Sequence, residues 1–199
     1  MKDCVLYIHG KGGSPDEAEH YKPLFPAARV LGLDYCAGTP WEAMEEFPVL
    51  YDDAVRDAVS VTVIANSIGA YFTMLSLAQK PIDHALFISP VVDMRALILR
   101  MTAWAGVTLD ALEARREIET DFGETLSWDY FRWVEDHPVR WAIPTRILCG
   151  SGDTLVPREE IEDFARQTGA PLTVMEGGEH WFHTQEQMAF LDGWIRGAV

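Results

Sequence analysis

Three residues that together can activate a hydroxyl group each lie just past the end of a short apolar stretch of the chain: Ser67, Asp153 and His180. A serine hydroxyl is a weak nucleophile at neutral pH, so a base must remove its proton as it attacks. A histidine can be that base, and an aspartate can hold the imidazole in one tautomer and stabilise its positive charge. These residue types are therefore the ones needed for acyl transfer through a covalent acyl-serine.

The segment around Ser67 has the pattern of a strand, a sharp turn and a helix. Residues 61–65 are almost all apolar and partly β-branched, which is typical of a strand buried on both faces. The apolar spacing over residues 68–79 predicts a helix that packs on this strand. Such a turn exposes the side chain at its apex and needs small neighbours, which Ala65 and Gly69 provide.

The sequence Ala65-Asn66-Ser67-Ile68-Gly69 resembles the Gly-x-Ser-x-Gly nucleophile elbow of the α/β-hydrolase family, with alanine at the first position. The order Ser, Asp, His along the chain is also that of the family. The resemblance covers nearly the whole chain. It implies a three-layer α/β fold and a triad with Ser67 as nucleophile, His180 as base and Asp153 as acid.

Two members of this triad have alternatives in the sequence. The stretch Gly150-Ser151-Gly152-Asp153-Thr154-Leu155-Val156-Pro157 is similar to the acid loop of the family, yet Asp153 also suits a turn or a helix cap. Asp93, after the preceding strand, is the alternative acid. His183 is the alternative base, and a His-x-x-His pair also occurs in metal sites, although no further ligands with a convincing pattern accompany it.

A glycine-rich turn at residues 9–14 follows the first apolar stretch. It matches neither the dinucleotide-binding nor the P-loop fingerprint. By resemblance to the family, this turn supplies one N–H group to an oxyanion hole, from Lys11 or alternatively Gly12, and Ile68 supplies the second. His9 is interpreted as a structural brace of the turn.

These residues are carried by an alternation of strands and helices, which predicts a mostly parallel sheet of about six strands with helices on both faces. In such folds the site lies at the carboxyl ends of the strands. Pro48 is expected to interrupt a helix that begins near residue 40, and residues 50–59 to form a separate amphipathic helix. The expected strands are residues 4–8, 29–33, 61–65, 85–88, 145–149 and 172–175.

Between residues 91 and 143 the alternation stops. Three helical stretches are expected there, at residues 94–105, 109–119 and 128–135. In the family, an insertion at this point commonly forms a lid, so the resemblance implies a helical lid at about 93–143. The aromatic residues of this region, which pack a core or line a pocket, are Trp104, Trp128, Tyr130, Phe131, Trp133 and Trp141.

Composition limits the classes of partner. The 199 residues predict a single domain, 1–199, and the net charge of −15 repels nucleic acid and anionic membranes, so neither is an expected partner. No apolar stretch reaches transmembrane length, and the N-terminal apolar run is too short for a signal peptide. Three cysteines are an odd number and indicate no disulfide framework, which favours the reducing cytoplasm.

Together these features predict a serine esterase or thioesterase that acts on a small-molecule acyl substrate of partly apolar character. No cofactor and no metal are expected for this chemistry. A peptidase, an amidase and an acyltransferase use the same triad, and a binding or regulatory protein can keep the fold without turnover. The acyl group, the leaving group and the oligomeric state are not defined by these motifs.

Overall fold

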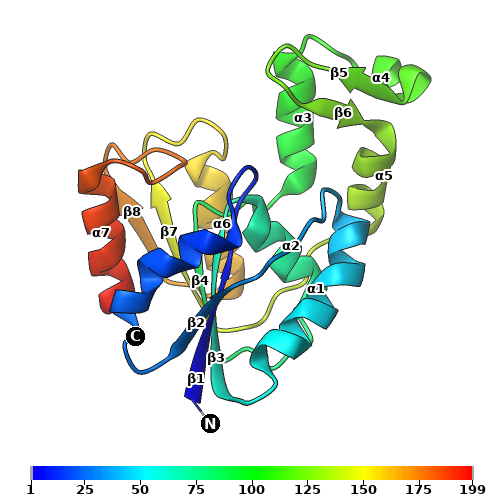
Figure 1. Cartoon of the computed structure of the whole chain (residues 1–199). Coiled ribbons are helices and arrows are strands. Elements are labelled where there is room, and N and C mark those ends of the chain that lie inside the picture. Colours follow the sequence, from blue (N-terminus) through cyan, green and yellow to red (C-terminus); the bar gives the residue numbers. More distant parts are fainter. Residues whose placement is uncertain (1, 199) are drawn as a thin grey trace. The chain divides into compact units, whose positions relative to one another are not determined.

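The computed structural model describes residues 2–198 and has a six-stranded sheet in the order β2-β1-β3-β4-β7-β8 (Figure 1). All neighbouring strands of this sheet are parallel. This confirms the predicted α/β class, six-strand sheet and fold. The strands are β1 (Lys2–Ile8), β2 (Arg29–Gly32), β3 (Ala58–Asn66), β4 (His84–Ile88), β7 (Thr145–Gly150) and β8 (Leu172–Met175).

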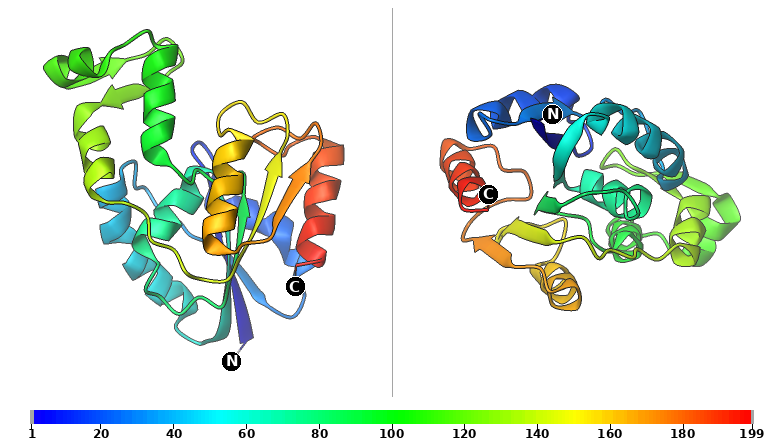
Figure 2. Two further views of the ribbon diagram at one scale, coloured as in Figure 1. Left: turned by 180° about the vertical axis from the view of Figure 1, so that it is seen from behind. Right: turned by 90° about the horizontal axis from the view of Figure 1, so that it is seen from below.

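Helices cover both faces of the sheet. The 3-10 helix η1 (Pro15–Leu24) and α7 (Gln185–Arg196) lie on one face, and α1 (Pro40–Val55), α2 (Ile68–Ser76) and α6 (Arg158–Thr168) lie on the other (Figures 1 and 2). Side chains of a strand alternate between the faces, so Val5 and Tyr7 pack beneath η1 and α7 in one buried cluster. The central strands are therefore buried on both sides, as their apolar sequences predict.

Helix α1 corrects one expectation. It runs without a break from Pro40 to Val55, through Pro48, and the last two residues of the helix expected over 50–59 belong to β3. Proline lacks an N–H group and removes one hydrogen bond of the helix, a local cost. Phe47 and Tyr51 on this helix are completely buried, and their packing outweighs that cost.

The chain divides into two compact units, one made of the residues up to Val92 and from Arg140 onward, and the other of Asp93–Val139. The second unit contains α3 (Met94–Trp104), α4 (Leu109–Arg115), an antiparallel hairpin of β5 (Glu117–Glu119) and β6 (Thr125–Ser127), and α5 (Trp128–Asp136). The expected helix over residues 109–119 is too long, because its last three residues form β5. A small core of Leu112, Ile118 and Leu126 holds this unit together. Its role as a lid stays a prediction.

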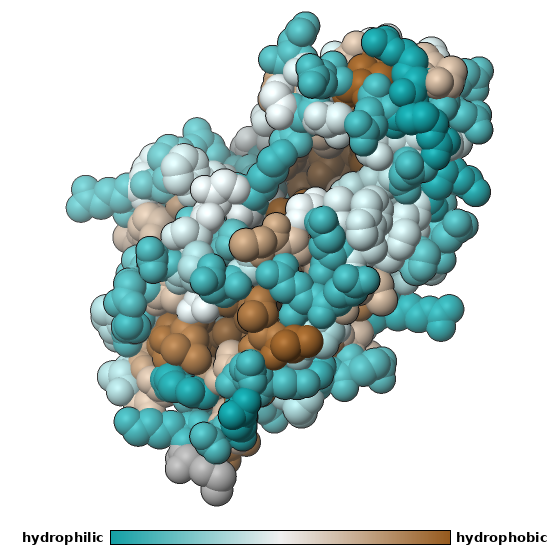
Figure 3. All heavy atoms as spheres, turned by 45° about the vertical axis from the view of Figure 1, so that its right-hand side comes forward, coloured by the Kyte–Doolittle hydropathy of each residue, from teal (hydrophilic) through white to brown (hydrophobic). Residues whose placement is uncertain are grey.

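The surface is mixed in character. Figure 3 shows apolar patches separated by many polar side chains on the face that it draws. Among residues 2–198, no helix combines the length and the apolar character that crossing a membrane requires. The large apolar side chains that are exposed are Trp41, Met44, Val49, Val59, Trp104, Phe122, Trp181 and Phe190.

Candidate active site

Ser67 stands at the apex of the turn between β3 and α2, in a strained backbone conformation. Its φ is 51° and its ψ is −121°, a combination that costs a non-glycine residue of the order of 1–3 kcal/mol. Hydrogen bonds to the end of β4 and to the turn after it hold Ser67 there: the Ser67 N–H donates to the Ile88 carbonyl at 3.0 Å, and the Val91 N–H donates to the Ser67 carbonyl at 3.1 Å. The end of a neighbouring strand thus stabilises the strained conformation of Ser67.

Gly69 is required by close packing of the elbow on the first strand. A Cβ atom at this position would lie 2.2 Å from the carbonyl oxygen of His9. Real Cβ atoms do not approach an oxygen so closely. Because this oxygen belongs to the backbone and cannot swing aside as a flexible side chain could, no larger residue fits without a shift of the turn. Ala65, at the other small position, is completely buried. The small-residue pattern of the sequence therefore has a direct steric cause.

The structure brings Ser67, His180 and Asp153 into one hydrogen-bonded chain. The Ser67 Oγ lies 2.8 Å from the Nε2 of His180, and the Nδ1 of the same ring lies 2.6 Å from the Oδ2 of Asp153. The three residues follow β3, β7 and β8, whose carboxyl ends lie at one edge of the sheet. With the proton on Nδ1 donated to the carboxylate, Nε2 is free to accept a proton from the serine.

The carboxylate of Asp153 is held from both sides. Its side chain is only 2% exposed, and its second oxygen accepts hydrogen bonds from the N–H groups of Leu155 and Val156 at 2.8 and 3.0 Å. Asp153 is not the cap of α6, because the cap position belongs to Pro157. These hydrogen bonds fix the orientation of the carboxylate toward the histidine.

The rival residues take other positions. Asp93 caps α3, where its Oδ1 accepts a hydrogen bond from the Ala96 N–H at 2.8 Å. The Nδ1 of His183 donates to the carbonyl of Trp181 at 2.7 Å, and the Trp181 ring stacks on it. In the described part of the chain, no group of three or more His, Cys, Asp or Glu residues is arranged to hold a metal ion. The geometry thus favours Asp153 over Asp93 and His180 over His183 as partners of Ser67.

The glycine-rich turn lies against the nucleophile. A Cβ atom built on Gly10 would lie 3.1 Å from the Cβ of Ser67, so Gly10 packs against the elbow. Lys11 is the next residue along the chain. Ile68 is the first residue of α2, and its N–H therefore has no acceptor inside the helix. An oxyanion hole made by the N–H group of Ile68 and that of Lys11, or alternatively Gly12, stays a prediction.

Tyr35 supports this turn, a role that no sequence pattern indicated. Its ring stacks on the buried His9 ring with 4.2 Å between centroids, and its hydroxyl donates to the His9 carbonyl at 2.8 Å. Burial raises the pKa of Tyr35, and the nearby carboxylates of Glu17 and Glu46 raise it further, so the hydroxyl remains a donor. The result agrees with the interpretation of His9 as a brace. This role of Tyr35 could not be predicted from the sequence, because a single tyrosine after the second strand belongs to no periodic pattern.

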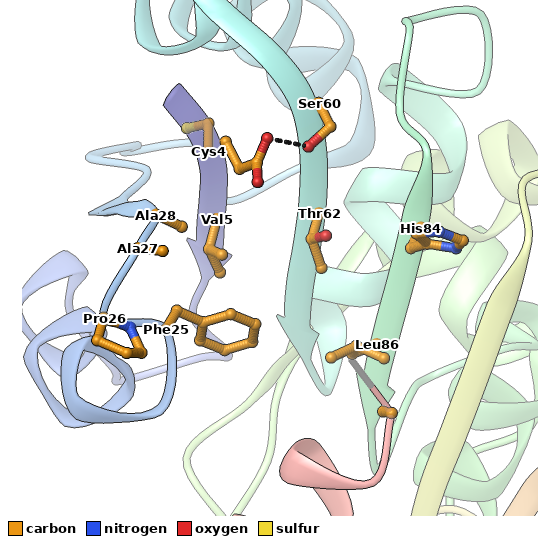
Figure 4. A pocket seen from close by; sticks show the side chains of 12 residues that line it. Cys4, Val5, Phe25, Pro26, Ala27, Ala28, Ser60, Thr62, His84 and Leu86 are labelled. Carbon is orange, nitrogen blue, oxygen red and sulfur yellow. Dashed lines mark hydrogen bonds between the residues drawn. The ribbon is translucent and has the colours of Figure 1, made fainter. Parts of the chain in front are cut away.

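A cavity of about 390 Å³ lies away from Ser67, at the amino ends of the strands. It opens over β1, β3 and β4, with Val5, Thr62 and Leu86 on its floor (Figure 4). None of the triad residues lines it. In parallel sheets, ligands bind beyond the carboxyl ends of the strands, so the position of this cavity does not suit a substrate pocket of the triad.

Comparison with known proteins agrees with this architecture. Est1E from Butyrivibrio proteoclasticus is 17% identical, with a TM-score of 0.76 over 99% of this chain and 86% of that chain. The chain has the α/β-hydrolase fold. Mouse alpha/beta hydrolase domain-containing protein 10 is 13% identical, with a TM-score of 0.77 over 98% of this chain and 88% of that one.

A third similar structure, a monoacylglycerol lipase from Paleococcus ferrophilus, is 14% identical, with a TM-score of 0.62 over 98% of this chain and 95% of that one. No protein-family model matches the chain, and no curated protein sequence matches it. The similarity is thus one of α/β-hydrolase structure at low sequence identity. The assignment of a reaction depends on the site itself.

Proposed function

We propose that this protein is a serine hydrolase that cleaves a carboxylic ester or thioester through an acyl-serine intermediate. The observation that carries the proposal is the continuous chain from Ser67 Oγ through His180 to the buried carboxylate of Asp153, with contacts of 2.8 and 2.6 Å. A base at hydrogen-bonding distance from a hydroxyl, itself oriented by a third group, is the arrangement that makes a serine nucleophilic.

The reaction follows from the positions of these groups. Nε2 of His180 takes the hydroxyl proton as Ser67 Oγ bonds to the acyl carbon, and Asp153 stabilises the imidazolium that forms. The N–H groups of Ile68 and Lys11 donate to the oxyanion. His180 then protonates the leaving alcohol or thiol, and a water molecule, deprotonated by the same ring, releases the acid and restores the serine.

The substrate class is inferred from charge and from the similar structures. A net charge of −15 disfavours polyanionic substrates, so a neutral or cationic acyl compound fits better. Among the similar structures are Est1E with bound ferulic acid and a monoacylglycerol lipase. These names describe the other proteins, and they support testing aryl and glyceryl esters first on this one.

The test is covalent labelling with a fluorophosphonate, followed by intact-mass measurement of the wild type and of Ser67→Ala. We expect one adduct per wild-type chain and none on the variant. The same pair is assayed with p-nitrophenyl esters of increasing acyl length, where Ser67→Ala is expected to lose at least about 10³-fold in kcat/KM. A folded wild type that forms no adduct, or a variant with unchanged turnover, would contradict the proposal.

A further inference from the structure

Tyr7 links the nucleophile elbow to the first helix through hydrogen bonds at its buried hydroxyl. The residue lies in β1 and is 1% exposed. Its hydroxyl donates to the Oε2 of Glu17 in η1, and the hydroxyl oxygen of Tyr7 is also hydrogen-bonded by the side-chain amide of Asn66. Asn66 is the last residue of β3 and directly precedes Ser67.

Glu17 also contacts the glycine-rich turn at residues 9–14. A Cβ atom built on Gly13 would lie 2.8 Å from Oε1 and 3.2 Å from Oε2 of Glu17, so the carboxylate fills the space beside the glycine-rich turn. The Gly13 N–H donates to the Gly10 carbonyl at 3.1 Å, and Gly10 packs on Ser67. One carboxylate therefore contacts the turn expected to bind the oxyanion and, through Tyr7, the elbow that carries the serine.

From this arrangement we infer that Glu17 is a positioning residue of the candidate active site, acting through Tyr7 and Asn66 to hold the elbow in register with the glycine-rich turn. The inference rests on the proposed function. Oxyanion donors help only when they are close to 3 Å from the developing charge, and displacements of about 1 Å can cost about 10²-fold in rate. Coupling the two loops through a charge-assisted hydrogen bond limits that displacement.

The protonation states suit this role. Burial raises the pKa of Tyr7 far above its ordinary value, and Tyr21 and Glu17 raise it further, so the phenol keeps its proton and remains a donor to the carboxylate. Glu19, two residues along the same helix, instead forms an exposed pair with Lys22. Glu19 therefore offers a matched control of the same residue type in the same helix.

The experiment measures kcat and KM for ester hydrolysis in Glu17→Ala, Glu17→Gln, Glu19→Ala, Tyr7→Phe and the double variant Tyr7→Phe/Glu17→Ala. We expect Glu17→Ala to lower kcat about 10-fold with KM changed less than about twofold, because positioning of the reacting groups is lost and substrate binding is kept. Glu17→Gln, which keeps an acceptor for the Tyr7 hydroxyl, is expected to stay within about threefold of the wild type. Glu19→Ala is expected to match the wild type.

The double variant separates a linked pair from two independent contributions. If Glu17 acts through Tyr7, adding Tyr7→Phe to Glu17→Ala lowers kcat no further, whereas independent residues multiply their effects. A Glu17→Ala kcat within twofold of the wild type, or multiplying effects in the double variant, would overturn the inference and leave the proposed function intact. A folded wild type without hydrolysis and without a fluorophosphonate adduct would overturn both.

Discussion

The two ends of strand β3 differ in how their polar groups are held. At its carboxyl end, Ser67 has a positive φ, and its side chain belongs to a hydrogen-bonded chain that ends at a carboxylate 2% exposed. At its amino end, the Ser60 hydroxyl donates to the exposed Asp3 at 2.8 Å, beside an open cavity and with no positive φ in the strand. The same strand thus leads into one part-buried network at a strained residue and carries one ordinary surface contact.

The cavity and the hydrogen-bonded chain lie toward opposite ends of the strand, and only the chain joins a serine to a histidine and a carboxylate. The cavity at the amino ends of the strands has a volume of about 390 Å³ and is lined by His84 and by Asp3, whose carboxylate accepts a hydrogen bond from Ser60. Backbone strain persists only where surrounding contacts hold it, as the backbone hydrogen bonds to the end of β4 and to the turn after it hold Ser67. The following variants test whether only the residues at the carboxyl ends of the strands take part in the reaction.

Removing the base is expected to have the largest effect. His180→Ala deletes the group that accepts the Ser67 proton, and loss of one member of such a triad costs up to about 10⁶-fold in kcat, so we expect a fall of at least about 10⁴-fold. Stopped assays with high enzyme concentration measure the residual rate. His183→Ala is the matched control and should stay within about threefold. If the two variants lost equal activity, the assignment of His180 would be wrong.

Neutralising the acid is expected to have the next largest effect. Asp153→Asn keeps the shape of the side chain, but it favours the wrong imidazole tautomer and leaves the imidazolium unstabilised, so kcat should fall about 10³- to 10⁴-fold. Asp93→Asn removes only a helix-capping carboxylate, and we expect a loss of about 1 kcal/mol in the free energy of unfolding at most, with activity retained. Activity loss confined to Asp93→Asn would reverse the assignment.

Substitutions at the amino ends of the strands should have almost no effect on turnover. His84→Ala and Asp3→Asn change side chains that line the cavity of Figure 4, far along the strands from Ser67. We expect kcat/KM for ester hydrolysis to stay within about twofold of the wild type. A fall of more than tenfold in either variant, with an unchanged melting temperature, would show that the two ends of the strands are coupled. The contrast drawn between them would then be wrong.

The smallest effect is expected from blocking thiols. Cys36 is exposed, whereas burial raises the pKa of Cys4 and, together with Asp153, raises the pKa of Cys149 to about 11. Because thiolate forms only as the pH approaches a raised pKa, Cys149 is almost fully protonated at pH 8. Ellman's reagent at pH 8 should titrate one thiol in the folded chain and none in Cys36→Ser, with hydrolysis unchanged. Modification of Cys149 in folded protein would contradict this.

Several elements were predictable because their signals are local. The apolar strands and the small residues of the elbow follow from burial and close packing, so β3, Ser67 and Gly69 are visible in the sequence. The hairpin of β5 and β6 was missed because each strand has three residues, too few for a period to appear. The path of α1 through Pro48 was missed because tertiary packing of Phe47 outweighs a local helix breaker.

The sequence by itself determined which chemical groups are present and in which order they follow the strands, because both depend on residue types and short-range periodicity. Tertiary structure decided which of them meet. Asp153 reaches His180 across 27 positions, and Ser67 reaches it across 113, whereas Asp93 caps a helix. The links from Tyr7 to Glu17 and Asn66 are also of this kind. Such contacts depend on strand order and loop paths, which no local pattern encodes.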